Sequence, residues 1–418
     1  MKKVVKKIAL LLLVFGIGVG VTLLYTYNKY KVYEEEEPKQ IKKHVDTISM
    51  MLETEAGSGN YEMTTRESWP TEGYVFNSKL SVCEHGSELS WDDANKTVLM
   101  SGNVSDKCYV YFDIKPQVLL ADYVKSLYTG TQGDNNIYYH DSSLTNGAGD
   151  SSYRYSGANP NNYVCFGSNE STCPTDNLYR IIGVFGNNVK LIKYDYGTTD
   201  ELGTDGDYNQ TYKEWGMDST YKGTYGDGER IGVYYWNNAT KTNTWSESLL
   251  NKTNLNTNFI NNIGEEWANK IATTTWKVGG NTYSNIYSKT PSVVYQNEIV
   301  NPVTTNTTDN ATEYTAKIGL MYVSDYGFAA EPSAWTLTIG NYNNTTATST
   351  NWMYMGLYEW TISRRADTSN FAFYVYYDGY VGDGGVGFSI AVRPSFSLES
   401  SITYVSGSGS ASDPMVIN

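Results

Sequence analysis

An apolar run sets the first 28 residues apart from the rest of the chain. Four lysines lie within the first seven residues, and the uncharged run from Ile8 to Leu24 follows them. A helix over this run is about 26 Å long, which is enough to cross the hydrocarbon core of a bilayer. Residues 1–28 are therefore predicted to form a basic cytoplasmic tip and a transmembrane anchor, with everything after it outside the cell membrane. A cleaved signal peptide is the alternative, although no small-residue cleavage site follows the run.

Residues 29–60 change to a different pattern. After four consecutive glutamates, the apolar residues Ile41, Val45, Ile48 and Leu52 recur at spacings of four and three. This spacing places them on one face of a helix, and a Gly-Ser-Gly triplet then ends the stretch as a flexible linker. The segment is predicted to be a short helical stalk.

Residues 61–114 alternate apolar and polar positions. The stretches GYVFNSKLSVC, ELSWDDANKTVLMS and KCYVYFD have the period of half-buried strands, and turn-forming residues separate them. A small all-β module is predicted, with Trp69 and Trp91 in its core. Residues 115–162 are predicted to be a connector: a helix within Lys115–Thr129, followed by an irregular Gly- and Asn-rich segment.

Residues 163–418 are predicted to be the main domain. LYRIIGVFGNNVKLIKYDY reads as a β-hairpin with its turn at residues 186–188. Apolar residues then recur every four positions from Phe259 to Ile271, which predicts a helix. The domain ends in a β-rich stretch, FAFYVYYDGYVGDGGVGFSIAVRPSFSL.

That last stretch, residues 371–398, is the candidate binding region. Apolar residues interleave with Tyr, Asp and Gly, and a period of two sends one set to the core and the other outward. Tyrosine offers a large contact area and loses little side-chain entropy on binding, and glycine lets the rings reach a partner. The predicted ligand-binding residues are Arg364, Arg365, Asp367, Tyr374, Tyr376, Asp378, Tyr380 and Asp383. A hairpin with half-buried tyrosines is the alternative.

Composition narrows the range of partners. Only 18% of the 418 residues are charged, 38 are tyrosines, and the net charge is −14. An acidic chain lacks the basic footprint that nucleic acids require, so no nucleic-acid partner is expected.

The four cysteines are Cys83, Cys108, Cys165 and Cys173. An even number in an exported chain favours two disulfides, and three pairings are possible. The two sequence-local pairs, Cys83–Cys108 and Cys165–Cys173, are preferred. Zinc is not expected, because no CxxC occurs and the three histidines are scattered. Calcium at the acidic loops 205–207 and 227–229 is a weaker alternative, and no metal or cofactor is predicted.

Catalytic chemistry finds little support. No histidine follows Asn146, so a Ser–His or Cys–His arrangement cannot be built in the main domain. A carboxylate pair such as Asp378 and Asp383 is the remaining option. Arg393, which precedes a proline, is predicted to be structural and to pair with a buried carboxylate such as Glu359. The chain is therefore predicted not to be an enzyme.

The order of these stretches, ending in YEWT at 358–361 and GFSIAVRP at 387–394, resembles the formylglycine-generating-enzyme-like branch of the C-type-lectin-like fold. It is similar to uncharacterised surface proteins of gut Firmicutes and to the variable proteins of diversity-generating retroelements. The resemblance implies an α+β domain with a central twisted antiparallel sheet, two helices and binding loops on one face. The chain departs from the cysteine-oxidising members, because no cysteine follows Cys173.

Together these predictions describe an extracellular recognition protein anchored in the cell membrane. It is expected to bind a protein or glycan ligand through the C-terminal loops, which the retroelement resemblance would make a diversified surface, and to contact the lipid bilayer through its N-terminal helix. The alternatives are an envelope carbohydrate-active enzyme that uses Asp/Glu pairs, and a structural envelope or pilus component.

Overall fold

The computed structural model describes residues 39–40, 48–103, 105–216, 220–302 and 311–418. The chain divides into two compact units, one up to Pro116 and one over Gln117–Asn418. Each unit has its own hydrophobic core.

Strands build the first unit. Its larger sheet has the order β3-β2-β8-β4, with β5 also paired to β8, and its smaller sheet has the order β1-β7-β6. The bounds are β1 Lys39–Gln40, β2 Ile48–Glu53, β3 Tyr61–Thr64, β4 Tyr74–Phe76, β5 Val82–Cys83, β6 Glu88–Asp92, β7 Thr97–Ser101 and β8 Cys108–Ile114. Trp69 and Trp91 both contact Phe112, with ring centroids 5.9 and 5.7 Å apart, which confirms their predicted packing role.

The predicted helical stalk is wrong over the residues that the structure describes. Ile48–Glu53 form β2, which runs parallel to β8 and antiparallel to β3. The helical interpretation used Ile48 and Leu52 and passed over Met50, which lies between them and is fully buried. Ile48, Met50 and Leu52 alternate with a period of two, so that one strand face packs against Val110 and its neighbours.

Both predicted disulfides are confirmed. Cys83–Cys108 joins β5 to β8, where the two cysteines are direct cross-strand partners. Cys165–Cys173 closes a loop at the end of β12. The first of these braces a unit with a small core, in which such help is most useful.

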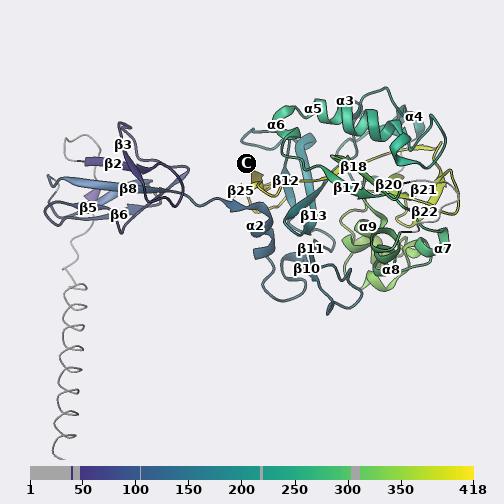
Figure 1. Cartoon of the computed structure of the whole chain (residues 1–418), viewed down its shortest axis with the longest axis horizontal. Coiled ribbons are helices and arrows are strands. Elements are labelled where there is room, and N and C mark those ends of the chain that lie inside the picture. Colours follow the sequence, from purple (N-terminus) through teal and green to yellow (C-terminus); the bar gives the residue numbers. More distant parts are fainter. Residues whose placement is uncertain (1–38, 41–47, 104, 217–219, 303–310) are drawn as a thin grey trace, which may run out of the picture. The chain divides into compact units, whose positions relative to one another are not determined.

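The second unit is organised around a mostly antiparallel sheet (Figure 1). Its order is β10-β11-β13-β14-β24-β19, with β12 also paired to β13. The predicted hairpin is present as β13 and β14, whose turn lies at Gly186–Asn187. The bounds are β10 Ile137–His140, β11 Ser152–Tyr155, β12 Tyr163–Cys165, β13 Leu178–Phe185, β14 Asn188–Lys193, β19 Ile318–Gly319 and β24 Ser395–Ser397.

Four smaller sheets surround it, with orders β15-β16-β23, β17-β18, β20-β21-β22 and β26-β25-β9. Their bounds are β9 Val118–Leu119, β15 Tyr208–Thr211, β16 Gly232–Tyr235, β17 Thr274–Lys277, β18 Glu313–Ala316, β20 Glu359–Arg364, β21 Phe371–Val375, β22 Val381–Gly385, β23 Ser389–Ile390, β25 Thr403–Ser406 and β26 Val416–Ile417.

The helices are short and pack around the central sheet. Figure 1 shows α3, α5 and α6 along one side of this unit and α7, α8 and α9 along another. The α-helices are α2 Leu120–Ser126, α3 Thr199–Leu202, α4 Tyr212–Trp215, α5 Ile260–Asn262, α6 Glu265–Ala268, α7 Tyr283–Ile286, α8 Pro291–Tyr295, α9 Val323–Ala329 and α10 Thr345–Thr350. The other helical turns are η1 Asp134–Asn136, η2 Thr175–Asn177, η3 Trp245–Glu247, η4 Leu250–Phe259, η5 Gln296–Val300, η6 Ala334–Thr336 and η7 Ile339–Asn341.

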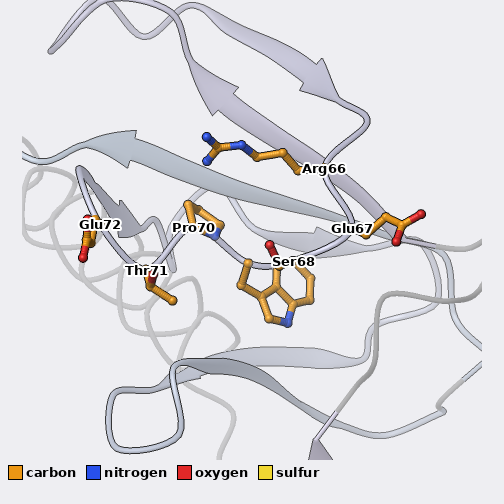
Figure 2. A pocket seen from close by; sticks show the side chains of 7 residues that line it. Arg66, Glu67, Ser68, Pro70, Thr71 and Glu72 are labelled. Carbon is orange, nitrogen blue, oxygen red and sulfur yellow. The ribbon is translucent and has the colours of Figure 1, made fainter.

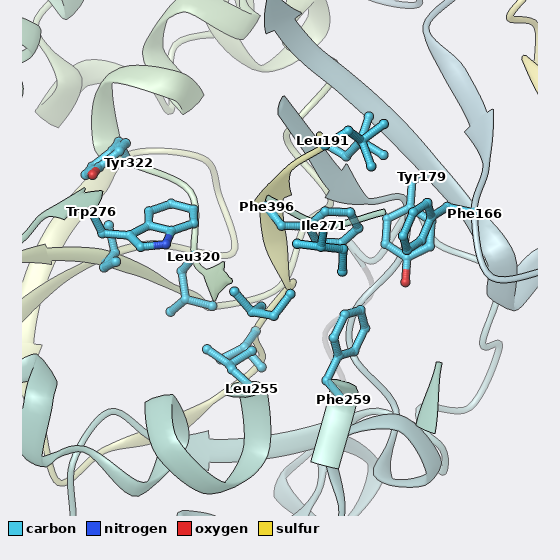
Figure 3. Close-up of a cluster of buried hydrophobic side chains, with 14 of the residues drawn as sticks. Phe166, Tyr179, Leu191, Leu255, Phe259, Ile271, Trp276, Leu320, Tyr322 and Phe396 are labelled. Atoms are coloured by element: carbon cyan, nitrogen blue, oxygen red, sulfur yellow. The ribbon is translucent and has the colours of Figure 1, made fainter. Parts of the chain in front are cut away.

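Apolar clusters cover both faces of the central sheet. Ile181 and Leu191 belong to the larger cluster, whereas the adjacent Ile182 and Ile192 belong to a second one. At the centre of the larger cluster, Phe396 of β24 contacts Phe166, Tyr179 and Phe259, with centroids 4.9, 5.5 and 6.1 Å away (Figure 3). This is why the apolar run near the C-terminus is buried.

The predicted fold class requires correction. Strands make up 32% of the structure and helices 21%, and the strands lie in several sheets. One dominant sheet with two helices does not describe this arrangement. The predicted helix over Phe259–Ile271 is interrupted, since Gly264 has a positive φ of 81° between α5 and α6.

The predicted membrane placement also requires correction. Among the described residues, no helix is long and apolar enough to cross a bilayer. The predicted anchor, residues 1–28, lies outside the described ranges. A single-pass protein of the cell membrane is therefore not supported, and we do not retain that prediction.

Candidate functional site

The candidate site is built on the three-stranded sheet β20-β21-β22. Register pairs Tyr374 with Gly382 and Ala372 with Gly384, so these four positions share one face. Phe373 pairs with Asp383 on the opposite face. Phe373, Val375 and Val381 pack into the second apolar cluster, as the period-two pattern predicted.

Three tyrosines stack on the first face. The ring centroids of Tyr374 and Tyr376 are 4.6 Å apart, those of Tyr376 and Tyr380 are 3.9 Å apart, and the rings are within about 21° of parallel. A Cβ added at Gly382 would lie 2.7 Å from the Tyr376 ring, and one at Gly384 would lie 2.7 Å from the Tyr374 ring. The glycines of β22 are therefore the floor on which the stack rests, which explains why so many rings and glycines alternate here.

Burial differs along the stack. Tyr374 is buried with 9% exposure, whereas Tyr376 and Tyr380 are half-buried. Burial, assisted by hydrogen bonding to the Tyr376 hydroxyl, raises the pKa of Tyr374 and of Tyr380. The stacked contacts hold the three rings in a fixed order.

Other rings extend this surface. Tyr358 contacts Tyr374, Tyr376 and Tyr377 at 5.3 to 6.0 Å. Trp215 contacts Tyr358 at 5.5 Å and is 41% exposed. Phe388, predicted to point inward, is instead 61% exposed, and it lies over Gly384. We call five of the partly or largely exposed rings of this group the tyrosine surface: Trp215, Tyr358, Tyr376, Tyr380 and Phe388.

Three of the predicted charged residues, Arg365, Asp367 and Asp383, form a separate group on the opposite face. Arg365 binds Asp383 at 2.7 Å and Asp367 at 2.9 Å, and its guanidinium lies 5.5 Å from the centroid of the Tyr283 ring. The hydrogen bonds that Arg365 donates to Asp367, together with the one it donates to Asp383, raise the pKa of Arg365 despite its partial burial. This group is internally paired, and its one guanidinium and two carboxylates leave a net charge of −1.

Arg364 and Asp378 do not join the tyrosine surface. Arg364 is 1% exposed and donates to the Val278 carbonyl at 2.7 Å, and burial lowers its pKa to about 10. Asp378 lies in the turn between β21 and β22, and its Oδ1 has no hydrogen-bond partner among the described residues. Of the eight predicted ligand-binding residues, only Tyr376 and Tyr380 belong to the tyrosine surface, with Tyr374 beneath them.

An ion pair fixes the sheet from below. Arg393 donates from Nε and Nη2 to the two carboxylate oxygens of Glu359, at 2.7 and 2.8 Å, and both side chains are buried. This confirms the predicted pairing. Burial raises the pKa of Glu359, and the charge of Arg393 opposes that shift. Arg393 also donates to the Met353 carbonyl at 2.7 Å, so it ties β20 to the segment before it.

The other hollows in the described residues are weaker candidates for a ligand-binding site. An open hollow of about 790 Å³ in the first unit is lined by residues 66–72, and Figure 2 shows Glu67 and Glu72 at opposite ends of this loop rather than as a pair. A groove of about 290 Å³ in the second unit lies between the Cys165–Cys173 loop and residues 411–417.

The acidic loops considered for calcium use their oxygens internally. Asp207 accepts hydrogen bonds from the backbone of Asn238 and Leu250. Asp227 and Glu229 both contact Lys213. Within the described ranges, no group of three His, Cys, Asp or Glu side chains is placed to hold a metal ion.

Searches with family models, against curated proteins and against solved structures found no match for this chain. The geometry must therefore carry the functional argument. Sequence reasoning missed Trp215 and Tyr358, because Trp215 ends α4 in a Gly- and Tyr-rich segment far from the C-terminal stretch and no periodicity connects the two.

Proposed function

We propose that this protein is a non-catalytic recognition protein that binds an extracellular protein or glycan through the tyrosine surface. The observation that carries the proposal is the fixed stack of Tyr376 on Tyr380, half-exposed and continuous through Tyr358 with the exposed Trp215. Aromatic side chains held in place before binding lose little entropy when a partner arrives.

The chemistry of the surface suits a neutral or weakly polar ligand face. Its five members carry no formal charge, and the nearby arginine, Arg365, is paired with Asp367 and Asp383. Tyrosine and tryptophan combine an apolar ring with a hydrogen-bonding group, which is why they dominate the energetics of many interfaces.

The proposal is tested with the full chain on a glycan array and in an affinity pull-down from extracellular fractions. A ligand found by either method should bind the Trp215→Ala and Phe388→Ser variants at least tenfold more weakly. Val405→Ser is the matched control, because Val405 is 50% exposed on β25 and lies outside the tyrosine surface. Equal binding by all four proteins would refute the proposed surface.

A further inference from the structure

A buried lysine and a buried aspartate meet where the central sheet contacts α9. Lys190 of β14 and Asp325 of α9 are 6% and 3% exposed. The Nζ of Lys190 lies 2.5 Å from Oδ2 of Asp325, although the two residues are 135 positions apart in the chain. The amine is thus held against the carboxyl group by two rigid elements.

Aromatic rings surround the amine. The Nζ of Lys190 is 4.5 Å from the centroid of the Tyr322 ring, 5.3 Å from that of Trp276 and 6.0 Å from that of Phe185. Burial lowers the pKa of Lys190, and the charge of Asp325 opposes that shift. An apolar setting of this kind makes the neutral, nucleophilic form of the amine easier to reach than it is in water.

A third buried acid completes the group. Glu298 accepts hydrogen bonds at 3.0 Å from the backbone of Val323 and Ser324, and it also contacts the Ser363 hydroxyl. Burial raises its pKa to about 7, so a large share of this carboxyl is protonated at neutral pH. The charge of Glu298 opposes the lowering of the pKa of Lys190, and the charge of Asp325 contributes to raising the pKa of Glu298.

Two donors hold the oxygens of Asp325. The Nη1 of Arg154 lies 3.6 Å from Oδ1, and the backbone nitrogen of Tyr322 donates to Oδ2 at 2.9 Å. The cation of Arg154 beside Oδ1 can stabilise the negative charge that develops on that oxygen during attack at Cγ, whereas the Tyr322 N–H lies on the departing oxygen, Oδ2.

We propose that Lys190 and Asp325 condense to form an intramolecular amide bond that cross-links β14 to α9. The lysine Nζ attacks Cγ of Asp325, and the displaced electron pair moves to Oδ1, beside Arg154. The carbon–Oδ2 bond then breaks and Oδ2 leaves as water with two protons, one from the original ammonium group and one from Glu298. Glu298 gives one proton to the leaving oxygen and recovers one from the nitrogen, so it ends unchanged.

The reaction is balanced without any co-reactant. An ammonium and a carboxylate become one amide and one water. Two buried charges disappear, and Arg154 keeps a partner in Asp150, whose Oδ2 lies 2.6 Å from Nη2. Removing an isolated ion pair from an apolar site avoids the cost of keeping both charges away from water.

The test is peptide mapping of the full chain by mass spectrometry after reduction, alkylation and trypsin digestion. An amide at Lys190 blocks cleavage there. The expected product is a branched peptide that joins residues 181–193 to residues 318–364 and is lighter by one water than the two separate peptides. Separate peptides with complete cleavage after Lys190 would overturn the proposal. A dehydrated 318–364 peptide that is not joined to 181–193 would also overturn it, since it indicates a cyclic imide at Asp325.

Two variants assign the roles. Lys190→Arg keeps a cation at the site but cannot form the amide, so the branched peptide should be absent while circular dichroism is retained. Glu298→Gln should reduce the cross-linked fraction at least tenfold after refolding. In the wild type the cross-linking rate should fall as the pH rises above about 7, because Glu298 then loses its proton. The charged and titratable groups around Glu298 are Asp325, Lys190 and Tyr322, together with Arg364, with which it lines a small cavity. Wild-type rates and pH dependence in Glu298→Gln would remove Glu298 from the mechanism.

Discussion

The interior of the second unit and its tyrosine surface distribute charge in opposite ways. Beneath the sheets, the charged side chains of Arg393, Glu359 and Arg154 are all nearly inaccessible to solvent. The tyrosine surface, by contrast, carries no formal charge. Charges in the interior must be paired, because desolvation makes an isolated buried charge costly. Aromatic rings can remain exposed at the surface, because an exposed apolar side chain costs little free energy there. The difference teaches that rigidity comes from the buried pairs and contact area from the rings.

The strongest test of this comparison is to break the buried pair. Arg393→Met leaves the Glu359 carboxylate buried without its partner and should lower the free energy of unfolding by about 3–5 kcal/mol, measured by urea denaturation. The Glu359→Gln/Arg393→Met double variant should recover part of this loss, because neither charge is then left alone. Full stability in the single variant would show that the pair does not hold the sheet.

The next largest effect is a dependence on pH. The pKa of Glu298 is raised from 4.5 to about 7 by burial, so the folded protein holds a proton that the unfolded chain has released. Its stabilising contribution is present below about pH 4.5 and is lost as the pH rises to about 7, by about 3 kcal/mol in total. Denaturation curves between pH 5 and 7.5 should show this slope in the wild type and a flatter one in Glu298→Gln. Equal slopes would contradict the buried, titrating acid.

A smaller effect is expected at the floor of the stack. In Gly384→Ala the new Cβ would lie 2.7 Å from the Tyr374 ring and 3.1 Å from that of Phe388. Because Tyr374 is buried and cannot swing away freely, we expect a loss of about 1–3 kcal/mol and a change in near-ultraviolet circular dichroism. Gly387→Ala is the matched control, since nothing lies within 4 Å of its added Cβ. Similar losses in both variants would mean that the contact with the ring is unimportant.

The smallest effect on stability is expected at the exposed rings. Trp215→Ala and Phe388→Ser should change the free energy of unfolding by no more than about 0.5–1 kcal/mol, because the two side chains are 41% and 61% exposed. Combined with the expected loss of binding, this would separate recognition from folding. A large loss of stability would instead assign these rings to packing.

Local patterns predicted the parts of the fold that local residues decide. The β13–β14 hairpin followed from two apolar runs around a Gly-Asn turn, and both disulfides followed from short spacings between cysteines. The prediction of a helical stalk was wrong because the apolar residues of β2 fit a helix as well as a strand. The strand conformation of β2 is set by its pairing with β8, about 60 residues later in the chain.

The candidate site was predictable only in part. A period of two placed Phe373, Val375 and Val381 inward, but it did not show that Tyr374 would be covered by Trp360, whose ring is 5.2 Å away. Arg364 and Arg365 are adjacent in the sequence but differ in their contacts: Arg364, the last residue of β20, donates to the buried Val278 carbonyl, and only Arg365 joins Asp367 and Asp383. Contacts between segments distant in the sequence decide which face of the β20-β21-β22 sheet is exposed to solvent, and the periodicity of one segment does not contain that information.

Placing β24 between β14 and β19 has a consequence for biosynthesis. Ser395 donates to the Leu191 carbonyl across 204 residues of sequence, so the central sheet stays incomplete until this late strand has left the ribosome. A nascent chain that is released early would expose the edge of β14 and the apolar pocket that Phe396 fills, which are features that chaperones and proteases recognise. Completion of synthesis thereby acts as a checkpoint on the folding of this unit.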